Sequence, residues 1–98
     1  MDFTLEENYQ PNKDRFVHYA VSGQVDAEVD FTPDKNAQTY TIDSTVVDPS
    51  LRGQGIAGSL MQKMATHARQ NSYQLINVCP YAVNYFDKHQ SDYADVLK

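Results

Sequence analysis

Residues 45–58 read TVVDPSLRGQGIAG, and this stretch joins two kinds of periodicity that together decide the fold. Before it, residues 38–47 are rich in Thr, Tyr, Ile and Val, a composition typical of a β-strand. After it, apolar side chains recur every four residues from Ile56 to Ala68, which predicts an amphipathic helix. The stretch is therefore a strand-to-helix junction that holds three of the four glycines.

The segments on either side of this junction predict a mixed architecture. Residues 25–31 alternate apolar and acidic side chains, which predicts a half-buried strand. The other expected elements are strands at 3–9, 15–21 and 75–78, a turn at 33–36, a helix end near 71–72, a second helix from Pro80 to about His89 and at most a helical turn in 92–98. A meander followed by helix, strand and helix indicates an α+β fold, a mostly antiparallel sheet packed with two helices.

Length and composition indicate one globular domain over residues 1–98. The chain is 41% hydrophobic and 21% charged, without repeats or a linker-like tract, so disordered and fibrous classes are excluded. A single cysteine excludes an internal disulfide framework. No apolar stretch approaches the roughly 18–20 residues of a membrane span, and residues 1–4 do not resemble a signal peptide. We therefore expect a cytoplasmic protein with no membrane partner.

Acidic residues are concentrated in the first half of the chain. Residues 1–51 hold ten Asp or Glu against three Lys or Arg, a net charge of −7, whereas residues 52–98 hold three acidic and five basic residues, a net charge of +2. Nucleic-acid binding relies on clustered Lys and Arg, so we expect no nucleic-acid partner. The asymmetry is either solubilising charge or a sign of a cationic ligand at the acidic half and an anionic ligand at the basic half.

The glycine junction is suited to a diphosphate. A helix start offers unpaired backbone N–H groups and a partial positive charge, and glycines let a phosphate approach because no Cβ intervenes. A purely structural glycine turn is the alternative. The junction also fits the dinucleotide pattern G-x-G-x-x-G, but that fold needs a parallel βαβ unit with an acidic residue about 20 positions on. Residues 75–79 read LINVC without an acid, so dinucleotide binding is rejected.

The junction resembles the acetyl-CoA motif of the GNAT acyltransferase superfamily, Q/R-x-x-G-x-G/A, which Arg52-x-x-Gly55-x-Ala57 matches. The resemblance covers residues 14–96. It extends to the strand and loop of residues 45–57, and the downstream residues that look like the compact single-domain branch of that family are Cys79-Pro80-Tyr81, Tyr85 and Lys88-His89.

The resemblance implies a domain that binds acetyl-CoA or CoA as cosubstrate. We expect no metal, because no two of His18, His67 and His89 share ligand spacing. The resemblance places the pantetheine arm along the backbone of Val46 and Val47. Apart from the resemblance, the charge of nearby basic residues such as Lys88 is expected to attract the CoA phosphates. The diphosphate would lie on the N–H groups of the loop, whose residues are Arg52, Gly53, Gln54, Gly55, Ile56, Ala57 and Gly58. The implied activity is N-acetyl transfer to an amine, either a small molecule or a protein lysine. A CoA-binding module without catalysis and a small adaptor protein are the alternatives.

Two departures from the family pattern affect the catalytic residues. Cys79 stands where the family usually has an asparagine, and Phe86 stands where it has the tyrosine that protonates the leaving thiolate. Cys79 and Tyr85 are therefore the candidates for this role. A thiol before a Pro80-initiated helix lies at the positive end of that helix, so it could accept the acetyl group or donate a proton; a small buried core residue is the alternative reading.

Several carboxylates could bind or deprotonate an amine acceptor. The polar face of the strand at 25–31 would steer a protonated amine toward the thioester, and one carboxylate could accept its proton. The alternative is a solvated face that prevents edge aggregation. The candidates, among which the sequence does not choose, are Asp26, Glu28, Asp30, Asp43, Glu6 and Glu7.

Overall fold

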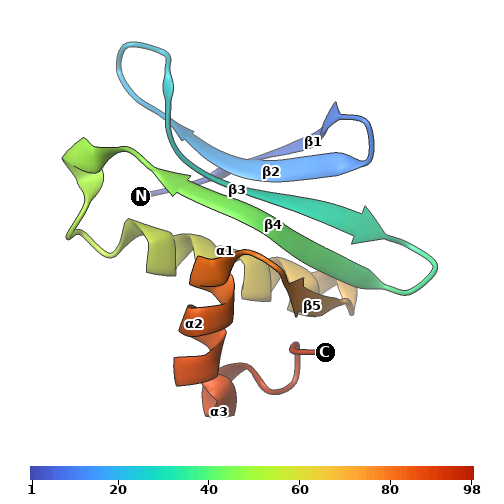
Figure 1. Ribbon diagram of the computed structural model, residues 1–98. Coiled ribbons are helices and arrows are strands. Elements are labelled where there is room, and N and C mark those ends of the chain that lie inside the picture. Colours follow the sequence, from blue (N-terminus) through green and yellow to red (C-terminus); the bar gives the residue numbers. More distant parts are fainter.

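Five strands form a single sheet in the computed structural model, which describes residues 1–98, and both longer helices lie on one side of it (Figure 1). The strands are β1 (Thr4–Gln10), β2 (Lys13–Tyr19), β3 (Val25–Asp34), β4 (Thr39–Val47) and β5 (Gln74–Asn77), and the helices are the 3₁₀ turn η1 (Pro49–Leu51), α1 (Ile56–Asn71), α2 (Pro80–Lys88) and α3 (Gln90–Tyr93). The sheet order is β1-β2-β3-β4-β5, with three antiparallel pairings and a parallel one between β4 and β5. The α+β prediction is confirmed.

The core follows from the alternation in β3. Ala27, Val29 and Phe31 are at most 1% exposed, while the acidic residues between them stand on the opposite face. Helix α1 covers the apolar face with one continuous stripe of buried side chains: Ile56, Leu60, Met61, Met64, Ala65 and Ala68. Burying this stripe against the sheet is what stabilises a helix of this length.

At both ends of α1 the flanking residue has a left-handed backbone conformation, which ends the helix there. Gly55 precedes the helix with a φ of +73°, and Ser72 follows it with a φ of +59°. The Ser72 N–H donates to the carbonyls of Ala68 and Arg69, which satisfies two of the carbonyls left unpaired at a helix end. The chain then enters β5, so α1 is the crossover that connects two parallel strands.

The C-terminal residues cover the exposed edge of β5, an arrangement that the sequence did not predict. Leu97 pairs with Leu75 in a parallel bridge. The Leu75 N–H donates to the Val96 carbonyl at 2.6 Å, and the Lys98 N–H donates to the Leu75 carbonyl at 3.1 Å. Val96 is only 2% exposed, so these residues protect an edge strand that would otherwise present unpaired backbone groups.

The turn expected at residues 33–36 lies two residues later. β3 continues through Pro33, which is opposite Tyr40, and the turn occupies residues 35–38. β2 pairs with β3 only as far as Phe31, so one edge of β3 needs no N–H donor at Pro33 and a proline is tolerated there. None of the helices combines the length and the apolar character that a membrane span requires.

Candidate active site

The loop between β4 and α1 has a backbone shape that requires glycine at two positions. Gly53 has a φ of +82° and Gly55 a φ of +73°, in the left-handed region where side chains are strained. Before them, Asp48 caps η1 by accepting from the backbone N–H of Ser50 at 2.9 Å and from its hydroxyl at 2.7 Å. These hydrogen bonds hold the pKa of Asp48 below its usual value. A capped 3₁₀ turn therefore leads into the two glycines that precede α1.

A pocket of about 200 Å³ lies between this loop, the first turn of α1 and Tyr81 on α2. No side chain caps the start of α1, and its first turn contains no acidic residue. The backbone N–H groups of Ile56, Ala57 and Gly58 consequently have no acceptor within the protein. The pocket is suited to an anion, and it is lined by Val47, Leu51, Arg52, Gly53, Gly55, Ile56, Ala57, Gly58 and Tyr81.

β4 and β5 separate near the start of α2. They pair only over Thr39–Ile42 and Gln74–Asn77, and the N–H groups of Val78 and Cys79 then both donate to the Ile42 carbonyl, at 3.2 and 2.9 Å. Beyond this point the chain turns into α2, so residues 43–47 of β4 have no backbone partner on that edge. This open edge leads directly to the glycine loop and can pair with an extended amide-containing ligand.

Cys79 lies where the two strands separate. It is the N-cap of α2 and is 4% exposed, and Pro80 follows at the first helical position. Its Sγ is 3.5 Å from the Oγ1 of Thr45, a residue of the open β4 edge. The structure therefore brings Cys79 next to the strand that contains Val46 and Val47.

Tyr85 lies between α2 and α1 rather than beside Cys79. Its ring is 3.4 Å from where a Cβ on Gly58 would stand, and its hydroxyl is 3.4 Å from Nε2 of Gln62. Gly58 thus lies in the contact between α1 and α2, a position that the sequence analysis did not assign to this glycine. Tyr81, four residues before Tyr85 and so on the same helix face, reaches the loop pocket instead, and burial raises the pKa of its hydroxyl.

The structure separates the remaining two candidate residues for cofactor binding. Gln54 is part of the loop but does not line its pocket. Lys88 is in the last turn of α2, at the opposite end of that helix from Cys79. Arg52 is therefore the basic residue that lines the loop pocket, and it also lines a neighbouring pocket of about 240 Å³ beside Val46 and Glu28.

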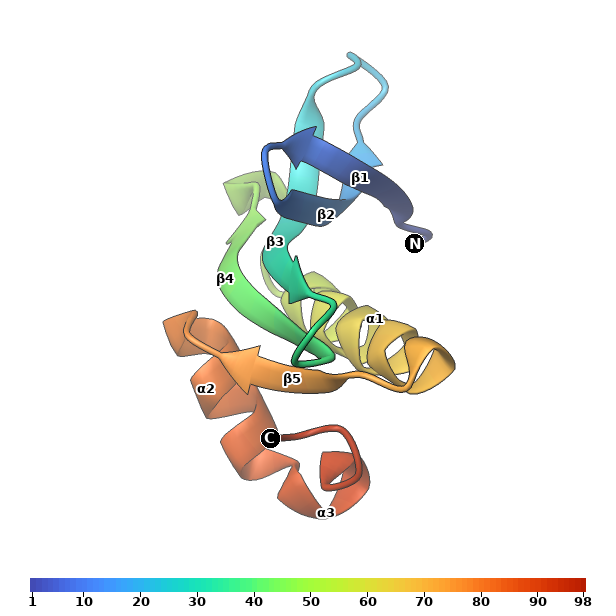
Figure 2. The same ribbon diagram turned by 90° about the vertical axis from the view of Figure 1, so that its right-hand side faces the viewer.

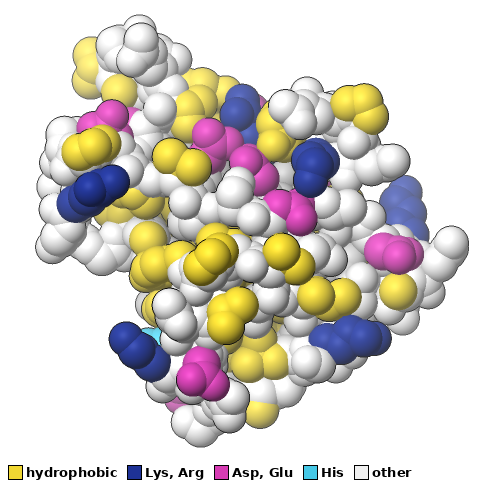
Figure 3. All heavy atoms as spheres, in the orientation of Figure 1, with side chains coloured by type: hydrophobic (Ala, Val, Ile, Leu, Met, Phe, Trp, Pro, Cys, Tyr) yellow, Lys and Arg dark blue, Asp and Glu magenta, His cyan; other side chains and the backbone are white.

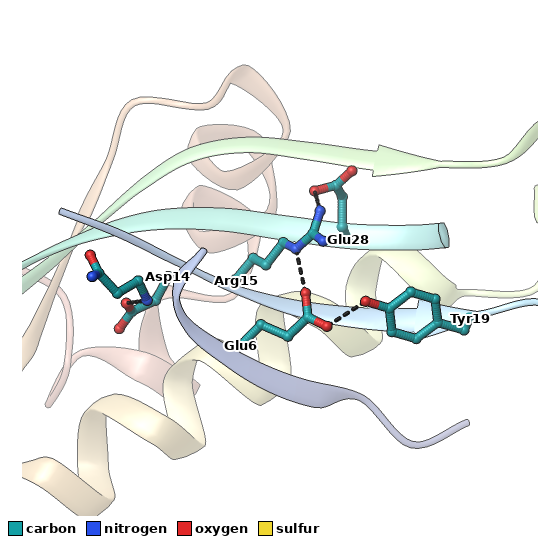
Figure 4. A network of polar contacts seen from close by, with 6 residues as sticks. Glu6, Asp14, Arg15, Tyr19 and Glu28 are labelled. Atoms are coloured by element: carbon teal, nitrogen blue, oxygen red, sulfur yellow. Dashed lines mark hydrogen bonds and ion pairs between the residues drawn. The ribbon is translucent and has the colours of Figure 1, made fainter. Parts of the chain in front are cut away.

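The sheet face turned away from the helices holds a group of acidic side chains with basic partners among them (Figure 3). Figure 4 shows Glu6 pointing between Arg15 and Tyr19. The Tyr19 hydroxyl and the Arg15 guanidinium, which is 2.8 Å away, both lower the pKa of Glu6. Arg15 also contacts Glu28 at 3.4 Å. This face is a half-buried network of ion pairs rather than a fully solvated surface.

The network distinguishes among the carboxylates that the sequence left open. Asp43 pairs with Lys13 at 2.9 Å and Asp26 with His18 at 2.6 Å. Asp30 accepts from the Ser44 hydroxyl at 2.8 Å through one oxygen, while its other oxygen is buried without a partner. Burial, followed by the adjacent Asp30, raises the pKa of Glu28 despite the opposing effect of Arg15.

The chain thus combines a glycine loop at a helix start with two parallel strands that separate beside it. Residues 15–96 match the family described as GCN5-related N-acetyl-transferase. The match covers most of the chain, and the protein belongs to this family. Members of the family are acyltransferases, and the architecture described above is the family's fold. None of the curated proteins is significantly similar to the chain in sequence.

Solved structures show the same fold. A GCN5-like protein from Staphylococcus aureus is 26% identical with a TM-score of 0.67, covering 97% of this chain and 87% of that one. Tetrahymena GCN5 is 18% identical with a TM-score of 0.66, covering 82% of this chain and 51% of its own. The Escherichia coli N-acetyltransferase YhbS, solved in complex with CoA, is 26% identical with a TM-score of 0.56, covering 65% and 38%. The chain thus spans about half the length, or less, of these last two proteins.

Proposed function

We propose that the protein transfers the acetyl group of acetyl-CoA to an amine. The observation that carries the proposal is the open edge of β4 at residues 43–47, which runs from Cys79 to the glycine loop. The pantetheine arm contains two amides, which can pair with the backbone of Val46 and Val47 on this edge. The diphosphate would then lie on the free N–H groups of the loop, and Arg52 would add a positive charge.

The reaction needs two proton transfers, one from the attacking amine and one to the departing CoA sulfur. The amine nitrogen attacks the thioester carbon, the C–S bond breaks, and the CoA sulfur leaves as a thiolate that requires a proton. Cys79 is our first candidate for this step because its thiol lies at the separation of the strands. In a second route its thiolate attacks first and passes the acetyl group to the amine. Tyr85 is the second candidate for proton donation, and its hydroxyl would have to leave Gln62.

We assign the acceptance of the amine proton to Glu28. It lies opposite Val46 in the β3–β4 register and lines the pocket beside the proposed pantetheine strand. Its raised pKa makes its carboxylate a stronger base than an ordinary glutamate, whereas Glu6, Asp26 and Asp43 are held by closer basic partners. The adjacent Asp30 adds to the negative potential that attracts a protonated amine.

Glu28→Gln should lower the rate of amine acetylation by about 100-fold, the usual contribution of a general base. In the parent protein the rate should rise with pH as Glu28 ionises, at a pH above the ordinary glutamate pKa of 4.5. This rise should be absent from the variant. The measurement is kcat/KM against pH with a small primary amine. Asp26→Asn, which lines the same pocket, is the matched control and should change the rate less than about threefold. Equal rates for Glu28→Gln and the parent would contradict the assignment.

Arg52→Gln should weaken CoA binding by about threefold to tenfold at low ionic strength, because it removes one charge from the phosphate pocket. Added salt should reduce the difference, since it screens an exposed charge. Calorimetric titrations with CoA at low and high salt measure both effects. Lys63→Gln on the middle of α1 is the control, and Lys88→Gln tests whether that residue also contacts a phosphate. An affinity of the parent that does not change with salt would contradict the role of Arg52.

A CoA-binding module without catalysis is the second candidate function. Phe86 favours it, because this side chain is 1% exposed in the core and has no proton to donate at the position of the usual tyrosine. The deciding experiment incubates the protein with acetyl-CoA and a panel of amines and lysine peptides, and detects free CoA and acetylated product. Saturable CoA binding without any product would favour the binding module over the enzyme.

A further inference from the structure

A second pocket, of about 460 Å³, lies at the end of the molecule opposite the glycine loop. It is formed by the β1–β2 turn, the β3–β4 turn and the last turns of α1, the end of the molecule that Figure 2 presents. His67 lines it and is eleven residues beyond Ile56, so the pocket begins about 16 Å along α1 from the loop. Its volume is within the range of small-molecule sites, and the acetyl-transfer proposal does not use it.

Tyr40 places an unpartnered hydroxyl in the wall of this pocket. The side chain is 6% exposed, with its ring stacked between Tyr73 at 4.4 Å and His67 at 4.9 Å. None of the hydrogen bonds within the protein involves its hydroxyl, although the residue lines the pocket. The hydroxyl oxygen is not one of the buried atoms that lack a partner, so it keeps accessible surface although the rest of the side chain is buried. The hydroxyl is therefore available to a ligand.

The charges around Tyr40 favour a cation. Glu7 and Asp14 line the pocket, and neither forms an ion pair with any Lys or Arg. Asp14 accepts only the backbone N–H of Asn8, at 2.8 Å. Burial lowers the pKa of His67, so the imidazole stays neutral near pH 7. Lys35 is the one basic residue of the lining, which leaves a net negative wall.

We propose that this pocket binds a small alkyl diamine or a similar organic cation with N–H donors, at a site separate from the glycine loop. One ammonium group would donate to the carboxylates of Glu7 and Asp14 and to the Tyr40 hydroxyl. The alkyl chain would contact the apolar surfaces of Tyr73, Leu5 and Pro33, which also line the pocket. The inference is independent of the acetyl-transfer activity, because none of these residues belongs to the proposed acetyl-CoA site.

The test is an NMR titration of the full chain with 1,5-diaminopentane. Saturable shifts are expected at Tyr40, His67 and Asn71, with no shifts in the loop at residues 52–58. The neutral probe 1,5-pentanediol and the dianion glutarate should cause no shifts at Tyr40, His67 or Asn71. Shifts confined to the face around Glu28 and Asp30, or equal shifts with the diol, would overturn the proposal.

Two substitutions separate a binding role from a structural one. Tyr40→Phe should weaken diaminopentane binding by about fivefold, the effect of one hydrogen bond, while the Tm of the free protein stays the same or rises. Glu7→Gln should weaken binding by a similar factor, whereas Asp2→Asn, an equal charge change at an exposed residue, should not. A lower Tm in Tyr40→Phe with unchanged affinity, or equal effects of Glu7→Gln and Asp2→Asn, would overturn the proposal.

Discussion

Gly55→Val should reduce the affinity for CoA and acetyl-CoA by about 100-fold or more. Gly55 has a φ of +73°, and a β-branched residue there costs about 1–3 kcal/mol of backbone strain. The loop can relieve this strain only by rotating the peptide groups that would hold the diphosphate. Calorimetric titration with CoA and acetyl-CoA measures the loss.

Gly23→Val is the matched control for this experiment. Gly23 has a φ of +89° in the turn between β2 and β3, and no atom is within 4 Å of the position of its missing Cβ, as at Gly55. Both variants should therefore lose comparable stability on thermal unfolding, while only Gly55→Val loses CoA affinity. If Gly55→Val binds CoA as tightly as the parent protein, the loop is not the phosphate site and the functional proposal fails.

Cys79→Ala should lower acetyl transfer by about 10-fold to 100-fold while leaving CoA affinity within about twofold. The affinity is retained because the proposed contacts to the diphosphate and pantetheine are made by backbone groups. The rate falls because alanine can neither donate a proton to the CoA sulfur nor accept an acetyl group. The measurements are steady-state transfer to the best amine of the panel and calorimetric titration with CoA.

Intact mass after incubation with acetyl-CoA separates the two roles of Cys79. It is the only cysteine of the chain, so a thiol-linked acetyl group has a single possible position. An adduct that Cys79→Ala lacks supports the acyl-enzyme route, and reduced activity without an adduct supports proton donation. Full activity of Cys79→Ala together with no adduct in the parent would return Cys79 to the role of a buried core residue.

The elements predicted from sequence were those with a strong local signal. The alternation at residues 25–31 and the four-residue period after Ile56 each report which face a segment buries, and the structure confirms both. The turn after β3 was predicted two residues too early, because a proline beyond the last β2 pairing is tolerated in a strand. The glycine loop was recognisable because positive φ angles leave glycine as the favoured residue.

The candidate site was predictable only in its backbone. Sequence located the loop and Cys79, since both directly flank predicted elements. It did not show that Tyr85 packs against Gly58 or that Tyr81 reaches the loop pocket. These contacts depend on how α2 crosses α1, and this crossing cannot be predicted from the spacing of residues within each helix.

The sequence by itself determined the class of fold, the position of the glycine loop and the family resemblance. The tertiary structure decided which carboxylates pair with Arg15, Lys13 or His18, and which have a raised pKa, as Glu28 does. It also decided that the pocket around Tyr40 exists at all, since its walls come from segments as far apart in the sequence as Leu5 and Tyr73. The physical reason is range: backbone periodicity and turn geometry act between neighbouring residues, whereas burial, ion pairing and cavities arise from packing between distant ones.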